Sequence, residues 1–202
     1  MKKFLTIFAF AAAFFGAPAS QASPVTFTAI LDGPSEAIPN ASPGTGNATV
    51  IIDAALHTMD VSATFSGLVG TTTASHIHCC TAIPDSGAAG VATTTPTFTG
   101  FPLGVTAGSY SHLFDMTDAG SYNPAFITGH GGTPGSAEAA LFAGMFADSA
   151  YFNIHTTQFP GGEIRGFLHA AQSVPEPGSL ALLGLGLAGL ALSRRNHRTS
   201  LH

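Results

Sequence analysis

The chain has 202 residues, of which 8% are charged, and it contains 24 Gly, 13 Pro and no Trp. Between the two terminal segments, residues 23–172 carry ten acidic side chains and one basic side chain, Arg165, so their formal charge is −9. A domain with this balance cannot neutralise phosphate groups, which excludes nucleic acid as a partner.

The first 22 residues are typical of a secretory signal peptide. Met1, Lys2 and Lys3 form a positively charged start, residues 4–15 are apolar, and small residues up to Ala22 provide a cleavage site. The apolar run is shorter than the roughly 20 residues that a membrane-spanning helix needs. We therefore expect export by the general secretory route and a mature domain that starts at residue 23.

The rest of the domain consists of short runs of β-forming residues separated by Gly, Pro and Asp. These runs predict strands at residues 25–31, 47–53, 57–68, 73–79, 110–116, 150–156 and 163–169. The strict alternation within residues 57–68 predicts a sheet with one solvent-facing side. The linker Pro160-Gly161-Gly162 predicts that the last two strands form an antiparallel hairpin.

One helix is expected at residues 136–148, with Ser136 as its cap and an apolar stripe for core packing. The segments 80–108 and 117–135 are expected to be loops, with a short strand at residues 91–94. We therefore predict a mainly β domain. Its expected architecture is an antiparallel β-sandwich of immunoglobulin-like or superoxide-dismutase-like character, with one short helix before the last hairpin.

Polar side chains alternate along two of the predicted strands. His76 and His78 share one face of the fourth strand, with Cα atoms ~6.6 Å apart, and Tyr151, Asn153 and His155 share one face of a later strand. If these strands are adjacent, His155 completes a three-nitrogen site of the kind that binds zinc or copper. The alternative is a buried hydrogen-bond network that satisfies itself.

A structural polar network is expected around the last hairpin, formed by Asn153, Thr156, Glu163 and Arg165. Because Arg165 is the one basic residue of the domain, it should pair with an acid, either Glu163 or Asp32. Such a buried pair is architectural rather than catalytic. The sequence contains no convincing nucleophile triad, phosphate loop or paired-acid site, so we assign no catalytic residue.

Cys79 and Cys80 directly follow the histidine pair. Adjacent cysteines leave three states open: free thiols, an intermolecular bridge, or a redox-labile vicinal disulfide. The alternation of the strand places Cys80 on the same face as His76 and His78, where binding of a soft metal is a further alternative to an inert role.

The composition changes at residue 173. Pro175, Glu176 and Pro177 precede an apolar run at residues 179–193, and Arg194 and Arg195 follow it. This tail resembles the PEP-CTERM sorting signal. The resemblance implies a Gram-negative bacterium, recognition by an exosortase-type protease, and a C-terminal helix in the inner membrane before processing. The basic end would stay cytoplasmic. The alternative is a plain membrane anchor.

Residues 23–172 resemble the CHRD domain, through the motifs Leu31-Asp32-Gly33, His76-Ile77-His78, Asn153-Ile154-His155-Thr156 and Gly162-Glu163-Ile164-Arg165-Gly166. The resemblance implies an extracellular β-rich domain, and the cysteine pair departs from the family pattern. The histidine pair, the later histidine and the arginine are also similar to the copper side of copper-zinc superoxide dismutases. A zinc-binding His/Asp loop is not evident in the sequence, which argues against dismutase activity.

The leading functional hypothesis is an exported cell-surface or matrix module that binds a partner or has a structural role. An extracellular polymer or a surface protein would be the partner, and the C-terminal signal would anchor or process the chain. A second hypothesis is a copper or zinc redox enzyme centred on His76, His78 and His155. A third is a protein–protein adhesion domain.

Overall fold

The computed structural model describes residues 23–171 and 186–187. These residues form a mainly β domain, as the sequence predicts. Its strands are β1 (Val25–Asp32), β2 (Thr45–Asp53), β3 (Thr58–Ser66), β4 (Thr72–His78), β5 (Gly108–Asp115), β6 (Tyr151–Thr156), β7 (Ile164–Phe167) and β8 (His169–Ala170).

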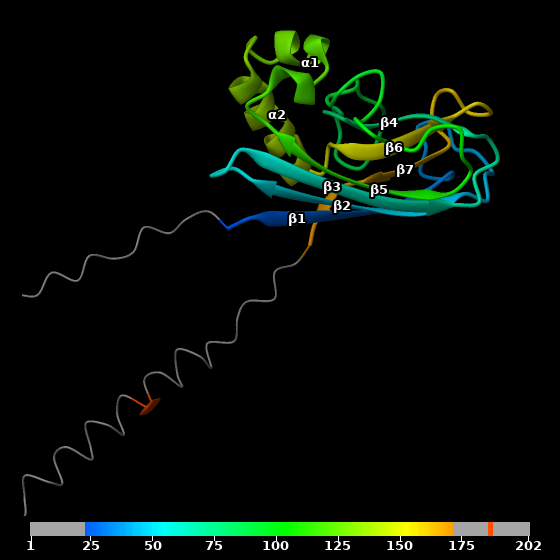
Figure 1. Cartoon of the computed structure of the whole chain (residues 1–202), viewed down its shortest axis with the longest axis horizontal. Coiled ribbons are helices and arrows are strands. Elements are labelled where there is room, and N and C mark those ends of the chain that lie inside the picture. The colour runs from blue at the N-terminus through cyan, green and yellow to red at the C-terminus, as the bar shows by residue number, and fades with distance from the viewer. Residues whose placement is uncertain (1–22, 172–185, 188–202) are drawn as a thin grey trace, which may run out of the picture.

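All strand pairs are antiparallel, and the strands join into one sheet with the order β4-β6-β7-β1-β2-β3-β5, with β8 paired to β1. The sheet curls into a half-barrel, so that β4, β6 and β7 lie across from β2, β3 and β5 (Figure 1). The predicted hairpin of β6 and β7 is confirmed by the register Asn153 to Arg165. The strand order places β6, from the last third of the chain, directly beside β4, with β7 on the other side of β6.

The hydrophobic core lies inside the curl. On β1, β2 and β3, alternate residues are buried, and the residues between them are largely solvent-facing and mostly polar, with Ile30 and Ile51 as apolar exceptions. This pattern confirms the predicted sheet with one wet side. Large side chains buried in this core include Phe27, Leu31, Met59, Phe98, Phe152 and Ile164.

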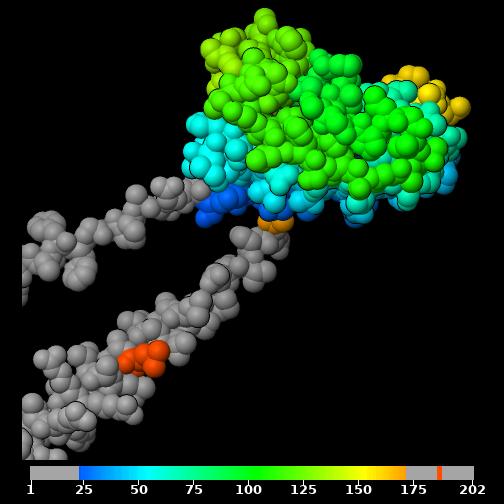
Figure 2. All heavy atoms as spheres, in the orientation of Figure 1, coloured from blue at the N-terminus to red at the C-terminus, as the bar shows by residue number. Residues whose placement is uncertain are grey.

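The helices gather at one end of the domain, where they form a distinct lobe (Figure 2). Helix α2 (Pro134–Phe146) is the expected helix, but it begins before Ser136. Thr133 is its N-cap, and Ser136 returns a hydrogen bond in a capping box, so the prediction that Ser136 caps the helix is wrong. The predicted loop before it contains a 3₁₀ turn (Ala119–Ser121) and a second helix, α1 (Pro124–Gly129).

Two strands are buried on both faces. β4 and β6 pack their Ile77, Phe152 and Ile154 side into the core, yet their opposite side is also mostly buried. The loop after β4 and the β6–β7 connection cover this second side, since their carbonyl groups contact its side chains. The predicted polar face is therefore enclosed rather than solvated.

Cys79 and Cys80 form a vicinal disulfide, one of the three states that the sequence leaves open. Because β4 ends at His78, the strand alternation does not extend to Cys80. Its sulfur lies 3.8 Å from the carbonyl oxygen of Ala140 in α2. The prediction that Cys80 shares the face of the histidines is thus wrong.

Among the residues that the structure describes, no helix is long and apolar enough to cross a membrane. The predicted signal peptide lies outside the described residues. So does the predicted tail, apart from residues 186 and 187.

Candidate metal centre

Three histidines converge on the enclosed face of β4 and β6. His76 and His78 come from β4, and His155 comes from β6, the neighbouring strand. Their ring centroids lie 5.3 Å apart for His76 and His155, 5.6 Å for His78 and His155, and 5.7 Å for His76 and His78. One nitrogen from each ring lies within 4.8 Å of the other two. The predicted proximity of these residues, separated by almost eighty positions in the sequence, is thus present in the structure.

A backbone carbonyl group orients each imidazole. Nε2 of His76 lies 2.6 Å from the oxygen of Pro96, Nδ1 of His78 lies 2.9 Å from the oxygen of Ala89, and Nδ1 of His155 lies 2.9 Å from the oxygen of Pro160. Because a carbonyl oxygen only accepts, each of these nitrogens carries the proton. The second nitrogen of each ring is therefore an unprotonated acceptor.

These second nitrogens are buried without a partner among the described residues. They are Nδ1 of His76, Nε2 of His78 and Nε2 of His155. Burial lowers the pKa of His76 and of His78 to about 4, and it also lowers the pKa of His155. The imidazoles are therefore neutral at pH 7, and their lone pairs are free. Buried polar atoms without hydrogen bonds are rare in folded proteins and call for an explanation.

An aromatic and cationic wall flanks the histidines. The ring of His78 stacks on Tyr151, with centroids 4.8 Å apart and an interplanar angle of 7°. The guanidinium carbon of Arg165 lies 4.5 Å from the centroid of the same Tyr151 ring. β4 and β7 lie on opposite sides of β6, so Tyr151 separates the imidazole from the guanidinium. This packing fixes the His78 side of the cluster.

Arg165 pairs with Glu36, not with Glu163 or Asp32 as the sequence predicts. Its Nε lies 3.9 Å from Oε2 of Glu36, and its guanidinium also donates to the carbonyl oxygens of Ser35 and Gly87. Asn153 donates to the same Glu36 oxygen at 3.5 Å. Alternation along strands could not reveal this partner, because Glu36 lies in the loop between β1 and β2.

Burial raises the pKa of Glu36 to about 7, although the nearby Arg165 opposes this rise. Oε1 of Glu36 and Oδ1 of Asn153 are buried without partners among the described residues. Gly162 allows this close packing, because a Cβ there would overlap Glu36 and Asn153, and its φ of 131° disfavours other residues.

Glu163 belongs to a separate cluster. Its Oε1 accepts from Oγ of Ser42 and the amide of Val69, each at 2.6 Å. Its Oε2 accepts from the amide of Gly70 at 3.1 Å and from Oγ1 of Thr156 at 2.6 Å. The four residues predicted to form one network thus divide into two: Thr156 with Glu163, and Asn153 with Arg165.

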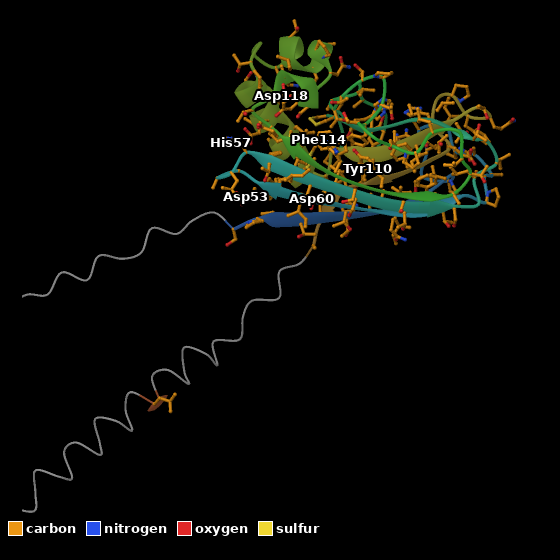
Figure 3. All side chains as sticks on the ribbon, in the orientation of Figure 1. Asp53, His57, Asp60, Tyr110, Phe114 and Asp118 are labelled. Atoms are coloured by element: carbon orange, nitrogen blue, oxygen red, sulfur yellow. A yellow bond between two sulfur atoms is a disulfide. The ribbon has the colours of Figure 1, made fainter. Side chains whose placement is uncertain are left out.

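Two further polar groups lie outside this face. Asp85, Asp148 and His169 cluster near the surface, where both imidazole nitrogens contact carboxylates at 3.4 and 3.1 Å. His57 lies at the turn between β2 and β3 (Figure 3). Its Nδ1 is 2.8 Å from Oε2 of Glu138. The sequence did not predict either group, since each joins residues from separate elements. In the first group, both imidazole nitrogens of His169 have carboxylate neighbours. In the second, His57 pairs with Oε2 of Glu138, while Oε1 of Glu138 is buried without a partner among the described residues.

Comparison with family models gives two matches. The CHRD domain model matches residues 27–168, and the model of the PEP-CTERM protein-sorting motif matches residues 173–195, which include Pro175, Glu176, Pro177, Arg194 and Arg195. Searches of curated proteins and of solved structures found no match. A PEP-CTERM signal indicates export and recognition by an exosortase. The CHRD match spans well over half of the chain, which therefore belongs to the CHRD domain family.

Proposed function

We propose that this protein is an exported metal-binding module of the cell envelope, in which His76, His78 and His155 hold one zinc or copper ion. Two observations on the same three rings carry the proposal. One nitrogen of each ring lies within 4.8 Å of the other two, and each ring has one buried nitrogen without a hydrogen-bond partner among the described residues. A hydrogen-bond network that satisfies itself would pair these atoms with donors. Here the described residues offer them none.

The donor chemistry fits these metals. Neutral imidazole nitrogens suit zinc and copper, whereas magnesium and calcium prefer oxygen ligands. The carbonyl oxygens of Pro96, Ala89 and Pro160 supply the outer contacts that usually fix the tautomer of a ligating histidine. They select Nδ1 of His76 and Nε2 of the other two histidines as ligands. Three such ligands leave room for a further group on the ion.

The placement of the domain follows from its C-terminal signal. We propose residues 1–22 as a signal peptide, residues 23–172 as the exported domain, and residues 173–202 as a tail that an exosortase recognises at Pro175, Glu176 and Pro177. Before processing, the tail would hold the domain at the outer side of the inner membrane. After processing, the domain would serve in the envelope or the extracellular matrix.

Metal analysis of the full-length protein, purified from the periplasm without chelators, tests the proposal. We expect one zinc or copper ion per chain, retained after dialysis, and no ion in the His76→Ala/His78→Ala variant. The His112→Ala variant is the matched control, because His112 lies on β5 outside the cluster, and it should keep the ion. Equal metal content in all three proteins, or none in the wild type, would contradict the proposal.

The same purified protein, with and without metal, distinguishes between the competing functions. Redox turnover that appears only in the copper-loaded protein, and not in the zinc-loaded or metal-free protein, would make the centre an enzyme, because zinc is redox-inert. Binding of a surface protein or polymer that persists after chelation would assign the domain to adhesion instead. Loss of that binding on chelation would show that the ion takes part in the contact.

A further inference from the structure

The Cys79–Cys80 disulfide lies between the end of β4 and helix α2. Cys79 is buried and Cys80 is exposed. Gly144 of α2 approaches both sulfurs so closely that a Cβ at this position would overlap them. Two thiol sulfurs need much more room than a bonded pair, whose atoms are about 2 Å apart. Opening the disulfide therefore has to displace either α2 or the chain at residues 79–80.

The chain at residue 79 is tied to the segment that orients His78. The amide of Cys79 donates to the carbonyl oxygen of Gly90 at 3.1 Å, and His78 forms a β-bridge with Val91. The preceding residue, Ala89, provides the carbonyl oxygen that holds Nδ1 of His78 at 2.9 Å. A shift at Cys79 thus acts directly on the segment that keeps Nε2 of His78 directed at the centre.

The same segment also contacts the flanking wall. The hydroxyl group of Tyr151 donates to the oxygen of Ala89 at 3.3 Å, and Arg165 donates to the oxygen of Gly87 at 2.9 Å. Loosening residues 87–91 therefore removes contacts of His78, Tyr151 and Arg165 together.

We infer that Cys79–Cys80 is a redox-active site, and that its reduction by a dithiol weakens metal binding at His76, His78 and His155. The inference rests on the proposed function, because it concerns the same centre. A thiolate of the dithiol attacks the exposed sulfur of Cys80, the disulfide bond breaks, and Cys79 leaves as a thiolate. The second thiol of the reductant then displaces Cys80. Two electrons and two protons pass to the cysteine pair, and the dithiol becomes a disulfide.

The expected loss follows from the role of the Ala89 carbonyl. Without its hydrogen bond, His78 can rotate or exchange its tautomer, so a bound ion must restore the ligand geometry. Loss of an outer contact of this kind typically lowers metal affinity by 10–100-fold. Zinc is the better probe, because it does not change oxidation state under reduction.

Zinc affinity of the full-length protein, measured by competition with a chromophoric chelator, tests the inference. One sample is oxidised, and the other is reduced with dithiothreitol and desalted without oxygen. We expect reduction to weaken zinc binding at least tenfold. The Cys79→Ser/Cys80→Ser variant should show the weaker affinity with or without reductant, which controls for direct effects of the reductant on the metal. Amide hydrogen exchange of metal-free samples should show faster exchange at residues 79–91 after reduction.

Each other outcome is decisive. Equal zinc affinity in both states overturns the redox inference and leaves the metal centre intact. Tighter binding on reduction that is absent from the Ser variant also overturns it, because the thiols would then be ligands. If the oxidised protein binds no zinc or copper, the proposed function fails and the effect on metal fails with it. The exchange rates then still decide whether the disulfide holds residues 79–91.

Discussion

Two buried polar clusters in this domain differ in how completely their atoms are paired. Around Glu163, both carboxylate oxygens accept two hydrogen bonds each, from Ser42, Val69, Gly70 and Thr156. In the histidine cluster, one nitrogen of each ring bonds to a backbone carbonyl, and the other has no partner within the part of the chain that the structure describes. Both clusters contain polar residues of the predicted strands. The clusters differ in whether their buried polar atoms all have hydrogen-bond partners.

The completeness of hydrogen bonding distinguishes a cluster that stabilises the fold from a cluster that can bind a ligand. A buried group whose hydrogen bonds are all made contributes to stability, and removing it leaves its donors unsatisfied. A buried group with a free lone pair costs stability unless a ligand occupies it. Substitutions at Glu163 should therefore act on folding, and substitutions at the histidines should act on metal binding.

The largest effect is expected for Glu163→Ala. This change leaves the amides of Val69 and Gly70 and the hydroxyl groups of Ser42 and Thr156 without their acceptor. Unsatisfied buried donors cost about 1–3 kcal/mol each, and partial relaxation should leave a total loss of about 3–5 kcal/mol. Urea unfolding monitored by circular dichroism measures the change. The Ser42→Ala control removes one of the four donors and should cost about 1 kcal/mol. A loss below that value for Glu163→Ala would contradict the architectural role.

His155→Ala should show the opposite pattern. We expect zinc affinity to fall about 100-fold, or about 2.7 kcal/mol, because one of three ligands is lost. The metal-free protein should lose only about 1 kcal/mol of stability, since Nε2 has no hydrogen-bond partner among the described residues and one hydrogen bond, from Nδ1 to the oxygen of Pro160, is lost. Isothermal titration with zinc, paired with urea unfolding in a chelator, measures both quantities. Destabilisation of the metal-free protein above about 3 kcal/mol, with zinc affinity unchanged, would place the histidine in the same class as Glu163.

The alternation of residues along the strands was enough to predict much of the fold and the histidines at the centre of the site. His76 and His78 had to share a face once their strand was recognised, and Tyr151, Asn153 and His155 had to share another. The sequence could not supply what came from loops. The histidines are oriented by backbone carbonyl oxygens of the covering segments. Every residue has such an oxygen, so the pattern of side chains cannot predict which of them make these contacts.

Loop residues also explain the errors in detail. Glu36 and Arg165 meet because the segment after β1 folds back over β7, and no periodicity records that path. Helix α1 has only six residues, too few to show a helical repeat in the sequence. Thr133, followed by Pro134, fits a helix start better than Ser136 does, since Pro favours the first helical position.

A pH experiment sharpens the comparison at Glu163. Burial alone would raise the pKa of its carboxyl group, but the hydrogen bonds from Ser42, Thr156, Val69 and Gly70 together lower it below the usual 4.5. A carboxyl with a lowered folded-state pKa stabilises the fold above its unfolded pKa. This contribution is lost as the pH falls through the folded pKa. The Glu163→Gln variant should therefore be less stable than the wild type by about 2 kcal/mol at neutral pH.

This stability gap should narrow below the unfolded pKa and close further as the wild-type carboxyl protonates. Urea midpoints of both proteins across the acid range measure it, with Ser42→Ala as a reference in which Glu163 stays ionisable. A gap that stays constant with pH would show that shape, and not the charge of Glu163, stabilises this cluster.

The smallest effect is expected at the His57 and Glu138 pair, in which an exposed side chain is paired with a buried one. The side chain of His57 is 52% exposed, whereas that of Glu138 is 8% exposed. His57 has a φ of 53°, so His57→Asn is the suitable change, because Asn tolerates the left-handed region. It removes the 2.8 Å contact without adding backbone strain. Water can reach the vacated side, so we expect a loss of at most about 1 kcal/mol.

Thermal unfolding of His57→Asn, Glu138→Gln and the double variant isolates the contact energy of this pair. A small coupling, with zinc affinity unchanged in all three variants, would show that solvent exposure sets the cost when a buried carboxylate loses its partner. A coupling as large as the Glu163 effect would instead mean that the pairing of atoms matters regardless of exposure. In that case burial would not be needed for the argument made for His76, His78 and His155. A nitrogen without a partner would indicate a ligand site equally well at an exposed position.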